Sequence, residues 1–455
     1  MDLTWDRTPE GMLCLALDSG GPSCVHVALW LEGGAGADPP GKSGLAHLYE
    51  HLFFQPEDAV SRRLFAELES FGGEPWAATF GDCVRLGLTV PPEGFDHGLR
   101  LLAELLGPRK WPAKAVRREA AAIAAEARER SDDPSLCTLF GALAEVYAQF
   151  PVAPRFAEER SEVRRVEPSD LESHHASIGP ARVILGVAGP SARELCTEAA
   201  RALQRVLTVD RGAGETGNQR GQWVCPRSPR EGGPRGGPEA LPPGARVGSV
   251  APSGPRVVVR RRRLDQAYLC LVLRLPDRTE GRQAVFEVLD GHLCQGLSPL
   301  LLRELRESAG VYDLTAEFDF WRSTASYCLY TSCAPHATGR VLAAVASTLR
   351  RVREKPPETE ELRRVKARRR MRLLSHIEAP LMALKWVGAQ AVALGVPGHP
   401  ALWLQQVESV TPEDLAAAAD SLLAHPPVLC AVGPALREDR LTEELRQAEG
   451  RWAGL

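Results

Sequence analysis

Apolar residues recur along this chain with two different periods. In residues 23–32 they alternate, with the Val and Leu residues from Val25 to Leu31 on one side. This pattern predicts a strand, and we expect its other face to be half exposed. In residues 44–54 apolar residues recur every three or four positions, with no glycine or proline after Gly44. This spacing predicts a helix.

The same criteria, together with Gly and Pro at the turns, assign the remaining elements. The first half gives strands at residues 11–18, 74–80, 84–90 and 182–188, and helices at residues 59–71, 95–106, 112–131, 168–178 and 192–207, with a further helix ending near residue 150. The second half gives strands at residues 257–260, 268–275, 312–318, 325–332 and 428–432, and helices at residues 283–293, 299–308, 338–353, 358–374, 379–394 and 412–423.

Both halves repeat the order strand, strand, two helices, hairpin, helices, strand. The sequence therefore predicts an α+β fold of two homologous α/β-sandwich domains, at residues 1–208 and 256–455. Residues 209–255 between them are dense in Gly, Pro and Arg and lack the apolar residues of a core. We expect this segment to be a flexible linker. The alternative is a long functional loop.

The charge, the apolar runs and the cysteines of the chain argue against several classes of protein. The chain has 455 residues and a net charge of -3, which gives no electrostatic reason to expect nucleic acid as a partner. No apolar run approaches the ~20 residues of a membrane span, and the acidic N-terminus lacks the order of a secretory signal. The 11 cysteines include no C-x-x-C pair, and Cys24, Cys270 and Cys328 lie in apolar runs. We therefore expect reduced, buried thiols and a cytoplasmic location.

The helix predicted at residues 44–54 carries the sequence His47-Leu48-Tyr49-Glu50-His51. Residues four apart lie on the same face of a helix, so His47 and His51 point the same way, with Glu50 beside them. Two imidazoles and a carboxylate suit a catalytic zinc, because nitrogen ligands hold the ion and a base takes a proton from the attacking water. The spacing H-x-x-E-H is the inverted zincin motif. The alternative is a chance occurrence on a buried helix.

A catalytic zinc normally has a third protein ligand. The helix predicted from residue 112 offers Glu119 and Glu126, which are seven residues apart and lie on one helix face. The residues between them are small and uncharged, which is typical of a tightly packed helix. Carboxylates on such a helix are costly unless they are paired or bind a metal. In the alternative interpretation both face solvent beside the neighbouring arginines.

Several motifs together resemble the pitrilysin/insulinase family of zinc peptidases, in its processing-peptidase-like, two-domain branch. They are Pro39 to His51, Glu119-x6-Glu126 followed by Asp133-Pro134, Leu264 to Tyr268, Gly296-Leu297-Ser298, Glu304 to Glu307, Gly310-Val311-Tyr312 and Val410 to Leu415. Nearly the whole chain except the expected linker takes part in this resemblance.

The resemblance implies a zinc-dependent endopeptidase that hydrolyses peptide bonds in extended peptides or unfolded polypeptides. His47, His51 and Glu126 would hold Zn²⁺, with Glu50 as the base. Glu119 would be a supporting acidic residue beside a ligand histidine.

The resemblance also implies donors to the scissile carbonyl from the second half of the chain. These would be Arg306 and Tyr312, although the family usually has one more residue between Gly310 and the tyrosine. Without a one-residue deletion, Asp313 takes the tyrosine's place. The alternative for Arg306 is an ordinary position on a charged helix surface.

The substrate is expected to pair with the edge strand Trp76-Ala77-Ala78. Trp76 stands where the family usually has Asn, and it is equally compatible with a core position.

The resemblance implies a homodimer, or a heterodimer with a homologous subunit in which this chain supplies the zinc. A third possibility is a non-catalytic peptide-binding or scaffold homologue. The substrate would be a peptide or an unfolded protein, with no nucleic acid and no membrane as partners. Neither the natural substrate nor the cleavage preference follows from the sequence.

Overall fold

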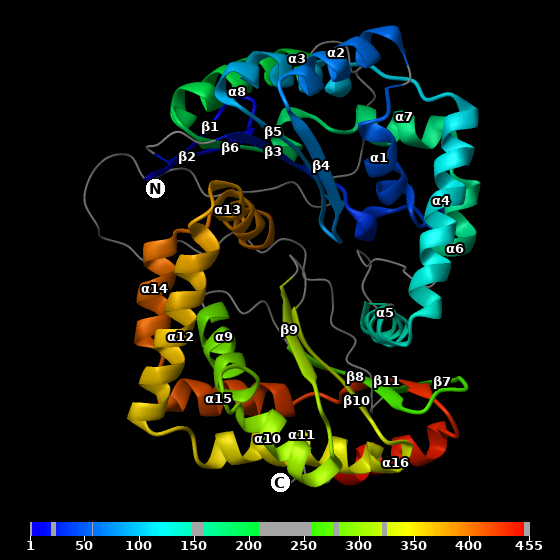
Figure 1. Ribbon diagram of the computed structural model, residues 1–455, viewed down its shortest axis with the longest axis vertical. Coiled ribbons are helices and arrows are strands. Elements are labelled where there is room, and N and C mark those ends of the chain that lie inside the picture. The colour runs from blue at the N-terminus through cyan, green and yellow to red at the C-terminus, as the bar shows by residue number, and fades with distance from the viewer. Residues whose placement is uncertain are drawn as a thin grey trace. The chain divides into compact units, whose positions relative to one another are not determined.

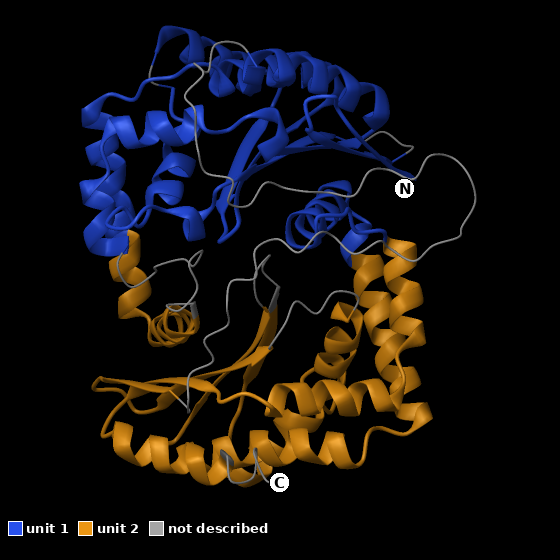
Figure 2. Ribbon diagram, turned by 180° about the vertical axis from the view of Figure 1, so that it is seen from behind, with its two compact units in different colours: residues 1–125, 152–247, 376–399 blue, residues 126–151, 248–375, 400–455 orange. Residues whose placement is uncertain are grey.

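The computed structural model describes residues 2–19, 24–56, 58–147, 159–208, 256–275, 282–320 and 325–449 (Figure 1). The predicted linker at residues 209–255 lies outside this part of the chain. The chain forms two compact units, coloured separately in Figure 2: residues 1–125, 152–247 and 376–399 form the first, and residues 126–151, 248–375 and 400–455 form the second.

The first unit is built on a six-stranded sheet in the order β1-β2-β6-β3-β5-β4. Its strands are β1 (Asp2–Arg7), β2 (Leu13–Asp18), β3 (Val25–Glu32), β4 (Glu74–Thr79), β5 (Cys83–Val90) and β6 (Val183–Gly189). Only β2 and β6 run parallel, and β4 forms an edge. One face of the sheet is buried under helices α1 (Leu45–Phe53), α2 (Ala59–Ser70), α3 (Phe95–Leu106), α4 (Ala113–Asp132), α7 (Pro168–Ala176) and α8 (Ala192–Thr208).

The opposite face of this sheet is covered by α13 (Pro380–Leu394), which comes from the second half of the sequence. The expectation that β3 has a half-exposed face was therefore wrong, because β3 is buried from Val25 to Leu31. Trp30 packs against Gly388 of α13, where a Cβ would lie 2.0 Å from the indole ring. The period-two pattern of β3 showed which residues share a face, but the helix that covers that face lies more than 350 residues further along the chain.

The second unit contains a five-stranded sheet in the order β7-β11-β8-β10-β9. Its strands are β7 (Arg256–Arg261), β8 (Ala267–Leu275), β9 (Leu314–Phe320), β10 (Ala325–Cys333) and β11 (Val428–Gly433). The accompanying helices are α9 (Gln283–Leu293), α10 (Leu300–Ala309), α11 (Thr338–Glu354), α12 (Thr359–Ile377), α14 (Pro400–Ser409), α15 (Pro412–Leu423) and α16 (Glu438–Glu449). Helix α5 (Pro134–Tyr147), from the first half of the sequence, packs on β8 and β11.

The predicted duplication is confirmed, because β2-β6-β3-β5-β4 and β7-β11-β8-β10-β9 follow the same order of elements. The predicted division into consecutive halves, residues 1–208 and 256–455, differs from the two units observed. Each unit takes one helix from the other half of the sequence: α13 joins the first and α5 joins the second. Hydrophobic periodicity marks these helices as buried but does not say which sheet they cover.

Four elements were not predicted from the sequence, namely β1, α6 (Glu159–Glu162), α14 and α16. Strand β1 and helix α16 are rich in charged residues, so neither shows a strong apolar pattern. Strand β9 begins at Leu314, and Tyr312 therefore precedes the strand that was predicted to contain it.

Among the described residues, no helix combines the length and the apolar content needed to cross a membrane. The cysteines of the described segments are all free thiols. Cys270 and Cys328 are buried as predicted, whereas Cys24 is exposed because it lies just before β3.

Candidate metal centre

Helix α1 is oriented by its buried face and by an acidic side chain at its N-terminus. Leu48, Tyr49 and Leu52 are fully buried, which leaves His47, Glu50 and His51 on the partly exposed face. The residue at the start of the helix, Gly44, has a φ of +94° and supplies no side-chain cap. Asp38 takes over that role, because its carboxylate accepts hydrogen bonds from the backbone N–H groups of Gly44 (2.7 Å) and Ala46 (2.9 Å).

Tyr49, between the two motif histidines, anchors α1 to α7. Its hydroxyl lies 2.8 Å from Nδ1 of His175, and Nε2 of that ring lies 2.7 Å from the carbonyl oxygen of Gly107. A carbonyl can only accept, so Nε2 carries the proton and Nδ1 accepts from the tyrosine. This buried chain of hydrogen bonds fixes the rotation of α1, and with it the direction of His47 and His51.

His47, His51 and Glu126 converge on one point. Each offers one ligand atom, and these atoms lie within 4.8 Å of one another. The two imidazole rings are 4.7 Å apart and nearly perpendicular, at 87°. Glu126 stands on α4, a continuous helix that also carries Glu119 two turns earlier. The division between the two units falls inside this helix, after Ala125.

A carboxylate lies against Nδ1 of each histidine. Glu119 approaches Nδ1 of His51 at 3.4 Å, and Arg118 holds its other oxygen at 2.8 Å. Glu159 of α6 (Glu159–Glu162) lies 2.9 Å from Nδ1 of His47. All four side chains of these two pairs are largely buried, with exposures of 10–20%. A carboxylate in this position fixes the tautomer and the orientation of a ligand histidine.

Glu119 was predicted from the sequence, whereas Glu159 was not. The latter lies 112 residues beyond His47, in a run of acidic and basic residues that carries no periodic signal. Gly44 gives an indirect signal, because a Cβ at that position would lie 3.1 Å from Cγ of Glu159. Glycine is therefore required before α1 for two reasons: the backbone has a positive φ there, and Glu159 approaches too closely for a side chain.

Glu50 is held at the end of the edge strand β4. The hydroxyl of Thr79 donates a hydrogen bond of 2.5 Å to Oε2 of Glu50. Side chains alternate along β4: Ala77 packs toward the helical face, whereas Trp76 packs toward α13. The predicted residues Trp76, Ala77 and Ala78 thus occupy the outermost strand of the sheet, and that strand ends beside Glu50.

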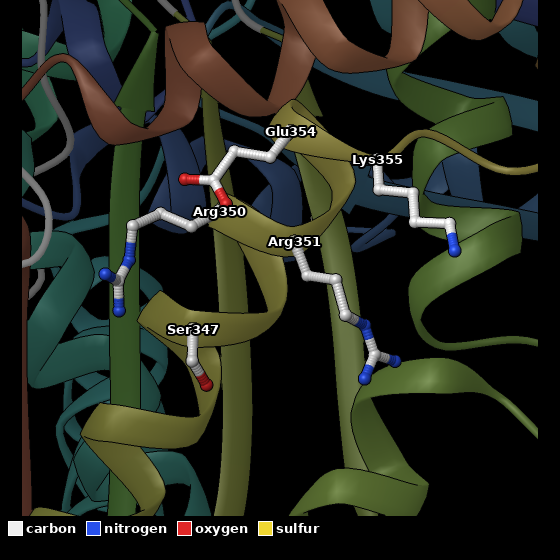
Figure 3. Close-up of a pocket in the computed structure, with 5 residues that line it drawn as sticks. All are labelled: Ser347, Arg350, Arg351, Glu354 and Lys355. Carbon is white, nitrogen blue, oxygen red and sulfur yellow. The ribbon is translucent and has the colours of Figure 1, made fainter.

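Arg306 and Tyr312 lie in the second unit. Arg306 is on α10, and its guanidinium donates to the backbone carbonyl of Tyr312 at 3.2 Å. The side chain of Tyr312 is 85% exposed. The same unit has a shallow pocket on α11, lined by Ser347, Arg350, Arg351, Glu354 and Lys355 (Figure 3), which shares no residue with the metal cluster.

Two family models of the same peptidase family match the chain. Residues 16–155 match the model described as insulinase (peptidase family M16), and residues 165–369 match the model described as the peptidase M16 inactive domain. The chain belongs to the M16 peptidase family. The metal cluster lies within residues 16–155, whereas the match to residues 165–369 takes in β6 and α8 of the first unit as well as β7 to β10 of the second.

Relatives and solved structures agree with this family. An uncharacterized zinc protease of Mycobacterium tuberculosis strain H37Rv is 24% identical over 94% of this chain and 92% of its own length. A probable mitochondrial-processing peptidase subunit beta of Arabidopsis thaliana is 22% identical over 44% of this chain and 38% of its own length. A protease from Helicobacter pylori has the same fold, with a TM-score of 0.75 and 17% identity, covering 95% of this chain and all of that one.

Proposed function

We propose that this M16 protein is a zinc-dependent endopeptidase acting on extended peptides or unfolded polypeptides. The observation that carries the proposal is the convergence of His47, His51 and Glu126, with Glu50 beside them on the same helix. The homologue names, which describe zinc proteases, support the same activity.

The donor set fits zinc. Two imidazoles and one carboxylate are the protein ligands of a common class of zinc hydrolase, in which a fourth position stays open. The carboxylates of Glu159 and Glu119 at Nδ1 of His47 and His51 favour Nε2 as the metal-binding nitrogen of each ring. When bound, zinc would supply Lewis acidity and lower the pKa of water toward neutrality.

In the proposed mechanism each protein side chain has a separate role. Glu50 takes a proton from the attacking water and passes it to the leaving amine. The hydrogen bond from Thr79 holds its carboxylate in place. Glu119 and Glu159 position the ligand rings. In this proposal Arg306 and Tyr312 donate to the carbonyl oxygen as negative charge develops there.

The edge strand β4 is the proposed substrate-binding element. An extended peptide can add to the outer edge of a sheet through backbone hydrogen bonds. Because β4 ends at Thr79, which touches Glu50, a peptide paired with Trp76, Ala77 and Ala78 would pass the proposed base. Only an extended segment can pair in this way, which favours peptides and unfolded chains as substrates.

The decisive experiment is the Glu50→Gln substitution. The variant should keep about one zinc per chain, because Glu50 is not a ligand. It should no longer cleave a peptide library, and mass spectrometry of the digest measures this loss. Glu317→Gln, on a strand of the second unit, serves as the matched control and should retain cleavage. Peptidase activity in Glu50→Gln equal to that of the wild type would refute the mechanism.

A second candidate is a zinc-bearing subunit that works with a homologous partner. The exposure of Tyr312 is the observation that favours it, because this second candidate does not require Tyr312 as the oxyanion donor. If the chain acts alone or as a homodimer, the purified protein cleaves peptides without addition. If it needs a heterodimer, activity appears only when a homologous subunit from the same source is added. Zinc binding without any cleavage in either assay would indicate a scaffold.

A further inference from the structure

Two cations meet over one aromatic ring beside the proposed substrate strand. Nζ of Lys385, on α13, lies 4.5 Å from the centroid of the Trp76 ring. The guanidinium carbon of Arg85, on β5, lies 5.8 Å from the same ring and 4.7 Å from that of Phe80. All four residues belong to the first unit. We call Arg85, Lys385, Trp76 and Phe80 the cation cluster.

Among the residues that the structure describes, neither cation of the cluster forms an ion pair with a carboxylate. The contrast within the same unit is Arg182, which pairs with Glu32 at 3.2 Å. Burial lowers the pKa of Arg85, and the negative charge of Glu50 opposes that shift only in part. The Nε atom of Arg85 is buried and makes no hydrogen bond. Burial lowers the pKa of Lys385, and the nearby positive charge of Arg85 lowers it further. Like charges brought this close out of water repel each other, so an added anion would be stabilised there.

The strand register places the cluster over the two outermost strands of the sheet, β4 and β5. Arg85 is opposite Ala78, and Trp76 is opposite Gly87. The indole covers Gly87, where a Cβ would lie 2.1 Å from the ring. The cluster therefore occupies the α13-facing side of the strand, opposite the side on which Thr79 binds Glu50.

A peptide paired with β4 would alternate its side chains between these two sides. We propose that the cation cluster is a subsite for an acidic side chain, Asp or Glu, of the substrate peptide. The proposal rests on the proposed function, since it requires the substrate to add to β4. The acidic group would be held by charge-assisted hydrogen bonds from Lys385 and Arg85, while its methylene carbons pack on Trp76 and Phe80.

The test uses zinc-loaded protein and peptides with blocked termini, so that the only carboxylate varied is a side chain. Matched peptides carry Glu, Gln or Lys at each position around the cleaved bond. At one position the wild type should favour Glu over Gln by roughly tenfold in kcat/KM. The preference should shrink at high salt, as expected for partly exposed charges.

Variants at Lys385 locate the effect. Lys385→Gln should reduce the preference to about twofold, and Lys385→Glu should favour the Lys peptide, because a carboxylate replaces the ammonium group. The control is Lys355→Gln, at a lysine just beyond the C-terminus of α11 (Figure 3), which should leave the preference unchanged. A wild type that does not distinguish Glu from Gln, or a preference that survives both Lys385 variants, would overturn the subsite.

A binding arm separates this proposal from the proposed function. Fluorescence anisotropy with labelled Glu and Gln peptides on Glu50→Gln does not require hydrolysis. If the wild type cleaves nothing but the Glu peptide binds more tightly and loses that advantage in Lys385→Gln, the subsite holds and the peptidase proposal fails. If cleavage occurs but binding does not distinguish the peptides, the subsite is refuted and the peptidase stands.

Discussion

The two units share an order of five strands, β2-β6-β3-β5-β4 and β7-β11-β8-β10-β9, but the helix that follows the equivalent strand carries different side chains in each. In the first unit β3 leads to α1, whose partly exposed face carries His47, Glu50 and His51. In the second unit β8 leads to α9, which carries Asp290 and His292. Asp290 accepts a hydrogen bond from Tyr327 at 3.0 Å, and His292 lies 3.4 Å from Glu361. Among the described residues, side chains that could together hold a metal ion converge only where α1 meets α4.

The shared fold does not by itself make a metal site. Burial raises the pKa of Asp290, and its contacts are those of a buried structural carboxyl group. The first unit's sheet differs because α1 and α4 bring three side chains together, with their ligand atoms within 4.8 Å of one another. The duplicated fold supplies equivalent helices, and the residues on one of them supply the chemistry.

The largest expected effect is loss of the metal. Glu126→Gln should abolish zinc binding and peptidase activity together, because a neutral amide replaces the charged ligand of the set. His292→Gln in the second unit should change neither. Zinc per chain is measured by inductively coupled plasma mass spectrometry after dialysis. Full zinc content in Glu126→Gln would remove this residue from the ligand set.

The next effect concerns the carboxylates behind the ligands. Glu159→Gln and Glu119→Gln should each weaken zinc affinity by about 10- to 100-fold, because the ligand ring loses its orienting partner. Competition with a chelator measures the affinity. Glu361→Gln, beside His292, is the matched control in the second unit. Equal zinc affinities in the wild type and in Glu159→Gln would show that Glu159 does not orient His47 for metal binding.

A smaller effect is expected where α13 covers the first sheet. Gly388→Ala should lower the free energy of unfolding by about 1–3 kcal/mol through overpacking against Trp30. Thermal unfolding would show it as a lower Tm. Adding Trp30→Leu should recover part of the loss, since the pair is coupled. Gly141→Ala on α5, next to Sγ of Cys430, makes the same comparison in the second unit. Additive losses for Gly388 and Trp30 would argue against the contact.

The smallest effect, when it is expressed per pH unit, is a pH dependence at the start of α1. Burial raises the pKa of Asp38 to about 7, from its usual 3.8. The folded state therefore binds more protons than the unfolded state between about pH 4 and pH 7, so stability should fall as pH rises through that window. The slope should stay below about 1.4 kcal/mol per pH unit, the limit for one proton.

Asp38→Asn should flatten this part of the profile, measured as the Tm of the metal-free protein between pH 4 and pH 8. Helix α9 gives the contrast, because its N-cap residue, Arg282, makes no side-chain capping bond. A wild-type Tm that rises steadily over the same range would contradict the assignment to Asp38.

Local sequence patterns predict much of the secondary structure of this protein. The helix at Phe95–Leu106, the helix at Pro412–Leu423 and the hairpin strands near Glu74 and Cys83 follow from hydrophobic period and turn residues. The spacing of His47, Glu50 and His51 predicts that they share a helix face, and Glu119-x6-Glu126 predicts a second shared face. Local geometry fixes these relationships, so the sequence determines them.

Contacts between distant segments were decided only by the tertiary structure. Glu159 reaches His47 across 112 residues, and Trp30 is buried by a helix more than 350 residues away. Helices α5 and α13 are both apolar, and hydrophobic periodicity does not show which sheet each one covers. Close packing at Gly141 of α5 and at Gly388 of α13 fits each helix to its own sheet. Sequence periodicity reports which face of an element is apolar, whereas packing decides what lies against that face.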